Sequence, residues 1–349
     1  MTAFAAGVAE ESLLDRIGVD ELARQSEALG GVDVRALCKA LMTGRLPVNG
    51  EAIRSALRRL LKGIRRALTE ALSLLAAPVL ASLALRAISD GDDHGIQLVC
   101  RMGCAALLSE RFIEARAVAA GALNASSKLI DAAAPALATA LTLTGSAGKA
   151  AILTPSAALC AKLTADVLNR IGLPLCGVIA IVAAAANLSE RFRLDRLFSL
   201  LTRWANGSVG LLLAGFVGLM ALQGLLVSGQ DALTARALRR AIHAALPVIG
   251  GEVSDSAGAL LGSAIAARNA VGVAGMLAAM GVCAAPLAKL ALSSLSLRLA
   301  AATLEPIADP GVTRVAGAFA EVHRLLLAIS AGGMLMSVLC LGACLAMAG

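Results

Sequence analysis

Apolar runs alternate with short charged segments along most of this chain, and the length of each run predicts whether it can cross a membrane. Three runs contain no charged residue, at 208–229, 270–288 and 325–347. As helices they would each reach about 30 Å, which is the thickness of the hydrocarbon core of a bilayer. We therefore predict a membrane-spanning helix at each of them.

Five further runs are apolar but carry a charge or a proline. They lie at 67–85, 95–108, 129–143, 150–168 and 171–188. Asp131, Lys162 and Asp166 fall inside these runs, and such groups are costly in lipid unless they face protein or water. Together with the uncharged runs, they predict about seven spans and an all-α fold, a polytopic membrane bundle of helices.

Amphipathic segments lie between the apolar runs. The clearest covers residues 189–204, and residues 231–243 and 313–324 are similar. Apolar and charged residues interleave there at helical spacing, which predicts helices that lie along the membrane interface.

The expected organisation has three parts. Residues 1–66 are polar and amphipathic, which predicts a small helical region outside the membrane. Its basic segment from Arg54 to Arg66 could lie on an anionic lipid surface or pack on its neighbours as a solvated helix. Residues 67–128 would form the first spans and connecting helices, and residues 129–349 the membrane core.

Short motifs within this core recur at an offset of 112 residues, which favours an internal duplication with repeats at 129–229 and 241–347. Duplicated membrane bundles typically place their working site where the repeats meet. The matching motifs are Ala132-Ala133-Ala134-Pro135 with Ala244-Ala245-Leu246-Pro247, and Gly172-Leu173-Pro174-Leu175 with Ala284-Ala285-Pro286-Leu287.

Polar residues interrupt apolar sequence between residues 246 and 272. The uncharged run 256–267 would reach only about 18 Å as a helix, too short for a core of about 30 Å. Irregular backbone at membrane depth must be covered by protein or line a wet cavity, so we predict a re-entrant or broken helix that forms a gate. Alternatively, its charges mark the interface beside a short helix. The candidate gate residues are Pro247, Gly250, Gly251, Ser254, Asp255, Gly262, Arg268 and Asn269.

Composition supports the membrane assignment. The chain is 58% apolar with a mean hydropathy of +0.80, whereas soluble domains are about 45–50% apolar. The net charge of +7 lies in clusters beside apolar runs, which favours anionic lipid over nucleic acid as a partner. At Met1 we find no signal-peptide pattern.

Candidate chemistry is sparse. The eight cysteines lie mostly in apolar segments without a C-x-x-C pair, which predicts buried apolar side chains. The three histidines stand apart, and neither H-E-x-x-H, G-x-S-x-G nor a phosphate-binding loop occurs. We therefore predict no enzymatic activity and no catalytic, cofactor or metal site.

Several motifs resemble the stage III sporulation protein AE family. The family signature of a proline, Gly-Gly, Ser-Asp, Leu-Gly and Lys-Asn-Ala-x-Gly is similar to Pro247, Gly250, Gly251, Ser254, Asp255, Leu261, Gly262, Arg268, Asn269, Ala270 and Gly272. The resemblance continues at Asn187-Leu188-Ser189-Glu190-Arg191-Phe192 and at Arg298-Leu299-Ala300-Ala301-Ala302 with Glu305-Pro306. Gly258 and Ala259 depart from the family's Asp-Thr, Arg268 replaces its lysine, and its signal peptide is missing.

This resemblance implies a non-enzymatic component of the channel or secretion-like complex that links mother cell and forespore, required after engulfment. It would be a multi-pass protein of the mother-cell membrane around the forespore. Its implied partners are other stage III sporulation A proteins and a forespore membrane partner. The residues alone leave an alternative, a self-contained secondary transporter with a broken-helix site at the repeat interface.

Overall fold

The computed structural model describes residues 15–29, 33–42, 69, 94–143, 147–188, 194–245, 252–306 and 310–346. All regular secondary structure in these ranges is helical, which confirms the predicted all-α fold. The elements are α2 (Val19–Ala28), α3 (Val34–Met42), α5 (His94–Leu143), α6 (Ala147–Val167), the π-helical segment η1 (Leu168–Gly172), α7 (Leu173–Leu188), α8 (Asp195–Ala245), α9 (Glu252–Leu304) and α10 (Pro310–Ala346).

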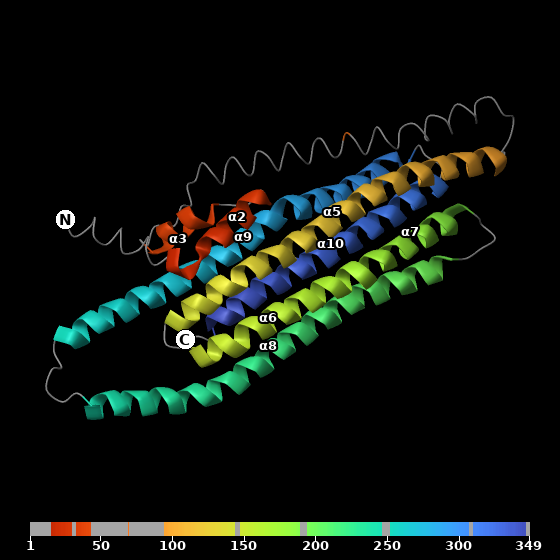
Figure 1. The fold of residues 1–349 in the computed structure, drawn as a ribbon. Coiled ribbons are helices and arrows are strands. Elements are labelled where there is room, and N and C mark those ends of the chain that lie inside the picture. The colour runs from red at the N-terminus through yellow and green to blue at the C-terminus, as the bar shows by residue number, and fades with distance from the viewer. Residues whose placement is uncertain are drawn as a thin grey trace.

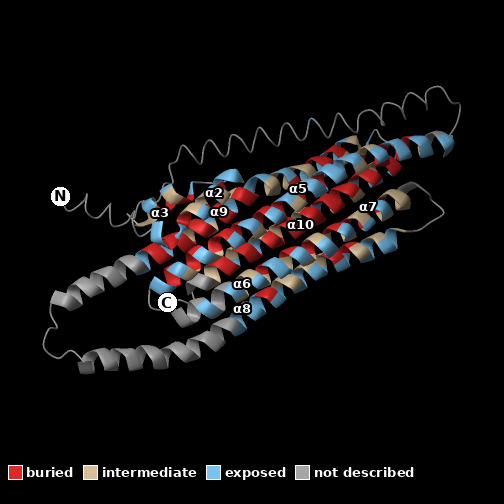
Figure 2. Cartoon of the chain, in the orientation of Figure 1, coloured by how far each residue is buried: buried red, intermediate tan, exposed pale blue. Residues whose placement is uncertain are grey.

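The long helices lie side by side in an elongated bundle (Figure 1). At its centre α10 packs against α9, α5, α7 and α8. Helix α5 pairs antiparallel with α6, and α9 with α10, while α8 covers the outside of α7. Buried residues concentrate where α5, α9 and α10 meet (Figure 2). Helix α10 therefore sets the positions of its neighbours along the long axis of the bundle.

Four helical stretches in the described part are long and apolar enough to cross a membrane. They are Ala158–Ala186, Asp195–Leu219, Ile265–Leu304 and Pro310–Ala343. The three uncharged runs predicted as spans lie within α8, α9 and α10, apart from residue 347, which is not described. This finding agrees with a membrane protein built from several helices. A long helix satisfies its own backbone hydrogen-bonding groups, as a segment that crosses lipid must.

The structure does not confirm seven spans. The expected spans at 150–168 and 171–188 are one rod, because η1 continues the helix between them: Val167 and Leu173, on either side, both have right-handed helical backbone angles. The expected span at 129–143 is the end of α5, where Asp131 is exposed. Residues 67–85 lie outside the described residues, apart from residue 69.

In the described residues, the predicted interfacial segments do not form separate helices. Residues 195–204 and 231–243 belong to α8, and residues 313–324 belong to α10. No proline interrupts α8, and Asn206 donates a 3.1 Å hydrogen bond to the carbonyl of Thr202 between the amphipathic and the apolar sequence. The helix therefore continues from amphipathic into apolar sequence. Residues 189–193 lie outside the described residues.

The expected duplication is likewise not confirmed. In the first half, α5 ends at Leu143 and α6 begins at Ala147. At the offset of 112 residues, the equivalent positions fall inside α9, which runs without interruption from Glu252 to Leu304. The two halves therefore reverse direction at different places, and an alanine-rich composition accounts for the short matches.

A hairpin of α2 and α3 docks on one end of the bundle. Arg35 holds it together through ion pairs with Asp15 and, at 3.2 Å, with Asp20. The hydroxyl of Thr139 in α5 donates a 2.8 Å hydrogen bond to the carbonyl of Ile17, and the Cys38 thiol lies 3.8 Å from the carbonyl of Ala270 in α9. Burial, with a smaller contribution from the Asp33 carboxylate, raises the pKa of Cys38 to about 12.

Candidate functional site

The predicted gate residues occupy the beginning of α9. Ser254, Asp255 and Gly262 lie within this helix, whereas Pro247, Gly250 and Gly251 lie outside the described residues. The run 256–267 is continuous with the rest of α9 and does not form a separate short element. On one continuous helix, the backbone positions of residues 255 and 268 are about 20 Å apart along the axis. A role for these residues in a gate stays a prediction.

Arg268 and Asn269 have different surroundings. Arg268 is buried and Asn269 is exposed. The Nε and Nη2 atoms of Arg268 lie 3.3 and 3.2 Å from Asn269 Oδ1. Ala270, two residues after Arg268, contacts Cys38 of α3 through its carbonyl group. The N-terminal hairpin therefore covers this part of α9 with protein.

A charged face runs along α5 and α6. Lys128 and Asp131 of α5 and Lys162 and Asp166 of α6 are all exposed. Asn169 donates a 3.2 Å hydrogen bond to Asn124, which fixes the register of the two antiparallel helices. At a rise of about 1.5 Å per residue, Lys128 is then level with Asp166, and Asp131 is level with Lys162. At each of these two heights along the helix axis, the face therefore carries one basic and one acidic side chain.

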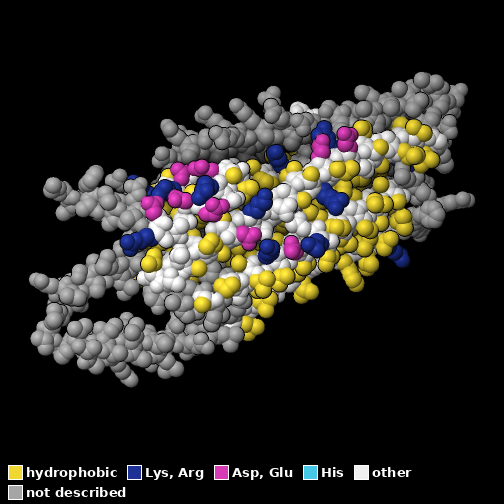
Figure 3. Space-filling model, viewed as in Figure 1, with side chains coloured by type: hydrophobic (Ala, Val, Ile, Leu, Met, Phe, Trp, Pro, Cys, Tyr) yellow, Lys and Arg dark blue, Asp and Glu magenta, His cyan; other side chains and the backbone are white. Residues whose placement is uncertain are grey.

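Figure 3 shows acidic and basic side chains in a row along this side of the bundle, while the edge over α7 and α8 is mainly hydrophobic. The ion pairs of the described residues join other side chains, in the N-terminal hairpin, in α5 at Arg111 and between α9 and α10. Within the described residues, none of these ion pairs joins two of the four exposed charges of the α5–α6 face. We call these four residues the charged face.

Contacts with α10 place the charged face level with the uncharged part of α10. A Cβ atom added at Gly333 would overlap Leu123, and one added at Gly311 would overlap Arg101. Both contacts join residues 210 positions apart, so α5 and α10 run parallel and Lys128 and Asp131 are level with α10 near residues 338 and 341. These positions lie inside the uncharged run 325–347, whose length matches a hydrocarbon core.

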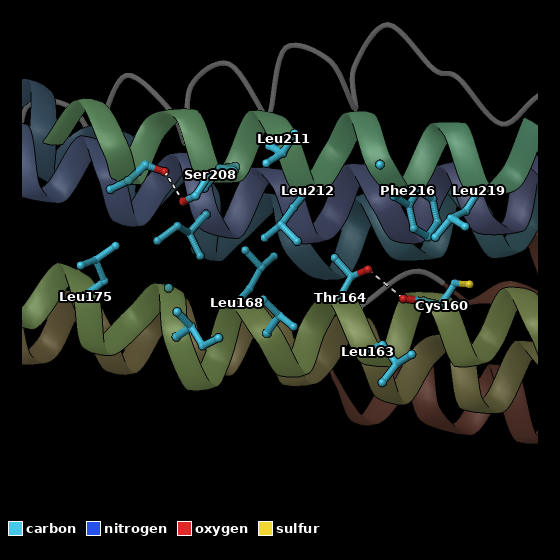
Figure 4. A pocket seen from close by; sticks show the side chains of 17 residues that line it. Cys160, Leu163, Thr164, Leu168, Leu175, Ser208, Leu211, Leu212, Phe216 and Leu219 are labelled. Atoms are coloured by element: carbon cyan, nitrogen blue, oxygen red, sulfur yellow. Dashed lines mark hydrogen bonds between the residues drawn. The ribbon is translucent and has the colours of Figure 1, made fainter. Parts of the chain in front are cut away.

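An apolar cavity of about 470 Å³ lies on the other side of α6, between the α6–α7 rod and α8. Figure 4 shows leucines from both helices pointing into it. Its two hydroxyl groups are satisfied by their own helices, because Thr164 donates to the carbonyl of Cys160 and Ser208 to that of Ala205, each at 2.8 Å. The cavity therefore suits an apolar group such as a lipid chain, rather than a polar solute.

The π-helical segment η1 lies between the two features. Leu168, Ile171 and Gly172 line the cavity, while Asn169 turns toward α5. Such segments are rare and often occur at functional sites. Here η1 presents apolar residues to the cavity beside α8 and a polar residue to α5.

Sequence reasoning missed part of this arrangement. Lys128 was not singled out, although its spacing of three residues from Asp131 places both on one helical face. Glu321 was missed as well. It accepts a 2.6 Å hydrogen bond from Arg298 of α9 and is also paired with Arg324, so it joins α9 to α10. Within the described residues, no three His, Cys, Asp or Glu side chains could hold a metal ion.

Comparison with known proteins identifies a family. The model of the stage III sporulation protein AE family matches residues 32–348. Stage III sporulation protein AE of Bacillus subtilis (strain 168) is 25% identical over 173 residues. That alignment covers 50% of this chain and 43% of the relative. No solved structure matches significantly.

Proposed function

This chain belongs to the stage III sporulation protein AE family, and we propose that it is a non-enzymatic membrane subunit of a channel or secretion-like complex. In this proposal the complex links mother cell and forespore after engulfment, and the chain lies in the mother-cell membrane around the forespore. Its partners would be other stage III sporulation A proteins and a forespore membrane partner. Family membership itself supports a role in sporulation.

The observation that carries a role as a subunit is the charged face at membrane depth. A charged side chain at the centre of the bilayer costs about 3 kcal/mol on insertion scales. Four such groups on one lipid-exposed face would oppose stable insertion of a lone chain. A chain with this surface is therefore expected to place it against protein or water, as a subunit of a larger assembly does.

A self-contained transporter has less support. That interpretation depended on a duplication and a broken helix, but α9 is continuous and the cavity beside α8 has an apolar lining. We retain from it the proposal that the beginning of α9 acts as a gate. Cysteines placed at positions 256–267 test the gate, because a wet gate predicts labelling by a water-soluble thiol reagent along one helical face.

Deletion of the gene tests the sporulation role. We expect vegetative growth to be unchanged and sporulation to stop after engulfment, with spore formation restored by a second copy of the gene. A variant with leucine at Lys128, Asp131, Lys162 and Asp166 should reach the membrane but fail to restore spores. The matched control replaces Glu110 and Arg111, which lie on α5 outside the apolar depth. Normal spore counts in the deletion strain would overturn the proposed function.

A further inference from the structure

We propose that the charged face pairs with the same face of a second copy of this chain, in the same membrane orientation. The proposal rests on the membrane role above and names the partner of the charged face. The two copies would be related by a two-fold axis along the membrane normal, a symmetry common in homo-oligomers. The evidence is the order of charges along α5 and α6.

The order of charges is self-complementary. Lys128 shares a level with Asp166, and one turn further along Asp131 shares a level with Lys162. A two-fold rotation about the membrane normal keeps every residue at its level and brings α5 of one copy opposite α6 of the other. Lys128 then faces the second copy's Asp166, and Asp131 faces its Lys162. Both levels match at once, and symmetry doubles the number of pairs to four.

The face also permits close approach. Gly121 lies one turn before Asn124 on the same exposed side of α5 and has open space around it. Small residues at such positions allow helices in membranes to come together closely. The neighbouring Asn124 and Asn169 bond to each other and leave further amide groups for a partner.

Other occupants fit less well. A lumen that carries ions of one sign is usually lined by rings of one charge, whereas the four charges here sum to zero. Pairing of copies in opposite orientations would bring α5 against α5, but copies of one membrane protein insert in one orientation set by their loops. Lipid is opposed by the cost of the charges themselves.

A charge exchange between two copies tests the proposal. Full-length chains with two different tags are produced together, reconstituted in lipid nanodiscs and captured through one tag. We expect Lys128→Asp alone, and Asp166→Lys alone, to lower recovery of the second tag about tenfold, because like charges then face each other. A mixture of the two variants should restore recovery, since the carboxylate introduced at position 128 of one chain then faces the ammonium group introduced at position 166 of the other.

Rescue in the mixture separates pairing between chains from pairing within one chain. Within each variant chain, residues 128 and 166 carry the same sign, so an intramolecular pair stays broken in the mixture. Glu110→Lys is the matched control, because it also reverses a charge on exposed α5 but outside the membrane depth; its recovery should equal that of the unchanged chain. Equal recovery for all variants, or no rescue in the mixture, would overturn the proposal.

Disulfide cross-linking provides a second measurement that tolerates a variant with poor yield. In a chain without native cysteines, Lys128→Cys in one copy should cross-link to Asp166→Cys in the other, whereas Leu211→Cys on the lipid-facing side should not. A cross-link only between two copies of Lys128→Cys, or free labelling of both cysteines by a water-soluble maleimide, would overturn the proposal. Arrest of sporulation in the deletion strain would then still support the subunit role.

Discussion

Two sides of this bundle meet their surroundings at the same depth with opposite chemistry. On α8, Leu211 is 75% exposed, and Val209, half a turn away, lies against Gly332 of α10. On α5, the exposed Lys128 lies little more than one turn from Leu123, which packs against Gly333. Because Gly332 and Gly333 are adjacent, Leu211 on the α7–α8 side and Lys128 on the α5–α6 side lie at nearly the same height along the bundle axis.

The difference shows that exposure has two meanings in a membrane protein. Exposed apolar side chains such as Leu211 and Ile171 are suited to lipid, which offers no hydrogen bonds. Exposed charges at the same height indicate a surface that another protein surface or water covers. Under the proposed function, the α7–α8 flank is an outer surface, and the charged face is an inner surface of the assembly.

The largest effect is expected from giving the α7–α8 flank the chemistry of the charged face. Leu211→Lys places an isolated charge in lipid, at a cost of about 3 kcal/mol, or roughly a hundredfold in the inserted fraction. The opposite change, Lys128→Leu, removes a charge and should leave insertion unchanged. Quantifying the chain in the membrane fraction checks both. Equal amounts of the Leu211→Lys variant and the unchanged chain would show that this flank is also covered by protein.

Local sequence carried enough information to predict the helices and the apolar depth, because both depend on neighbouring residues. Residues 208–229, 270–288 and 325–347 lie in continuous helices for this reason, as far as the structure describes them. Asp131, Lys162 and Asp166 could also be recognised as costly in lipid. Their common surface could not be predicted, because it depends on the register that the Asn124–Asn169 bond and the contacts with α10 establish.

Helix ends were harder to predict, because glycine and charge were given too much weight. Arg268 and Asn269 suggested the end of a short helix, yet the backbone of α9 continues through them. Similarly, residues 169 and 170 separated the predicted spans 150–168 and 171–188, but η1 passes through them as a π-helical turn. In lipid, an unbroken helix satisfies every interior backbone group, and this requirement outweighs weak local signals.

An intermediate effect is expected at the contact that aligns the two sides. A Cβ at Gly333 would overlap the side chain of Leu123, with Leu168 also nearby. Gly333→Ala should therefore destabilise the bundle by about 2 kcal/mol, as overpacking typically does. Gly317→Ala is the control, because a Cβ there would meet nothing within 4 Å. Thermal unfolding in detergent checks the pair, and similar melting temperatures would contradict the close approach of α5 and α10 on which the common depth depends.

The smallest effect is expected from removing the polar groups of the α7–α8 side. Thr164 and Ser208 are the hydroxyl groups of the cavity, and both already donate to carbonyls of their own helices. Thr164→Val with Ser208→Ala should therefore change stability by less than about 1 kcal/mol and leave spore formation unchanged. In contrast, Asn124→Leu removes a bond between two helices and leaves Asn169 without that partner. Spore counts for both variants, at matched amounts of membrane protein, compare the two sides directly. A loss of spores in the double variant alone would show that polar recognition takes place in the cavity and not at the charged face.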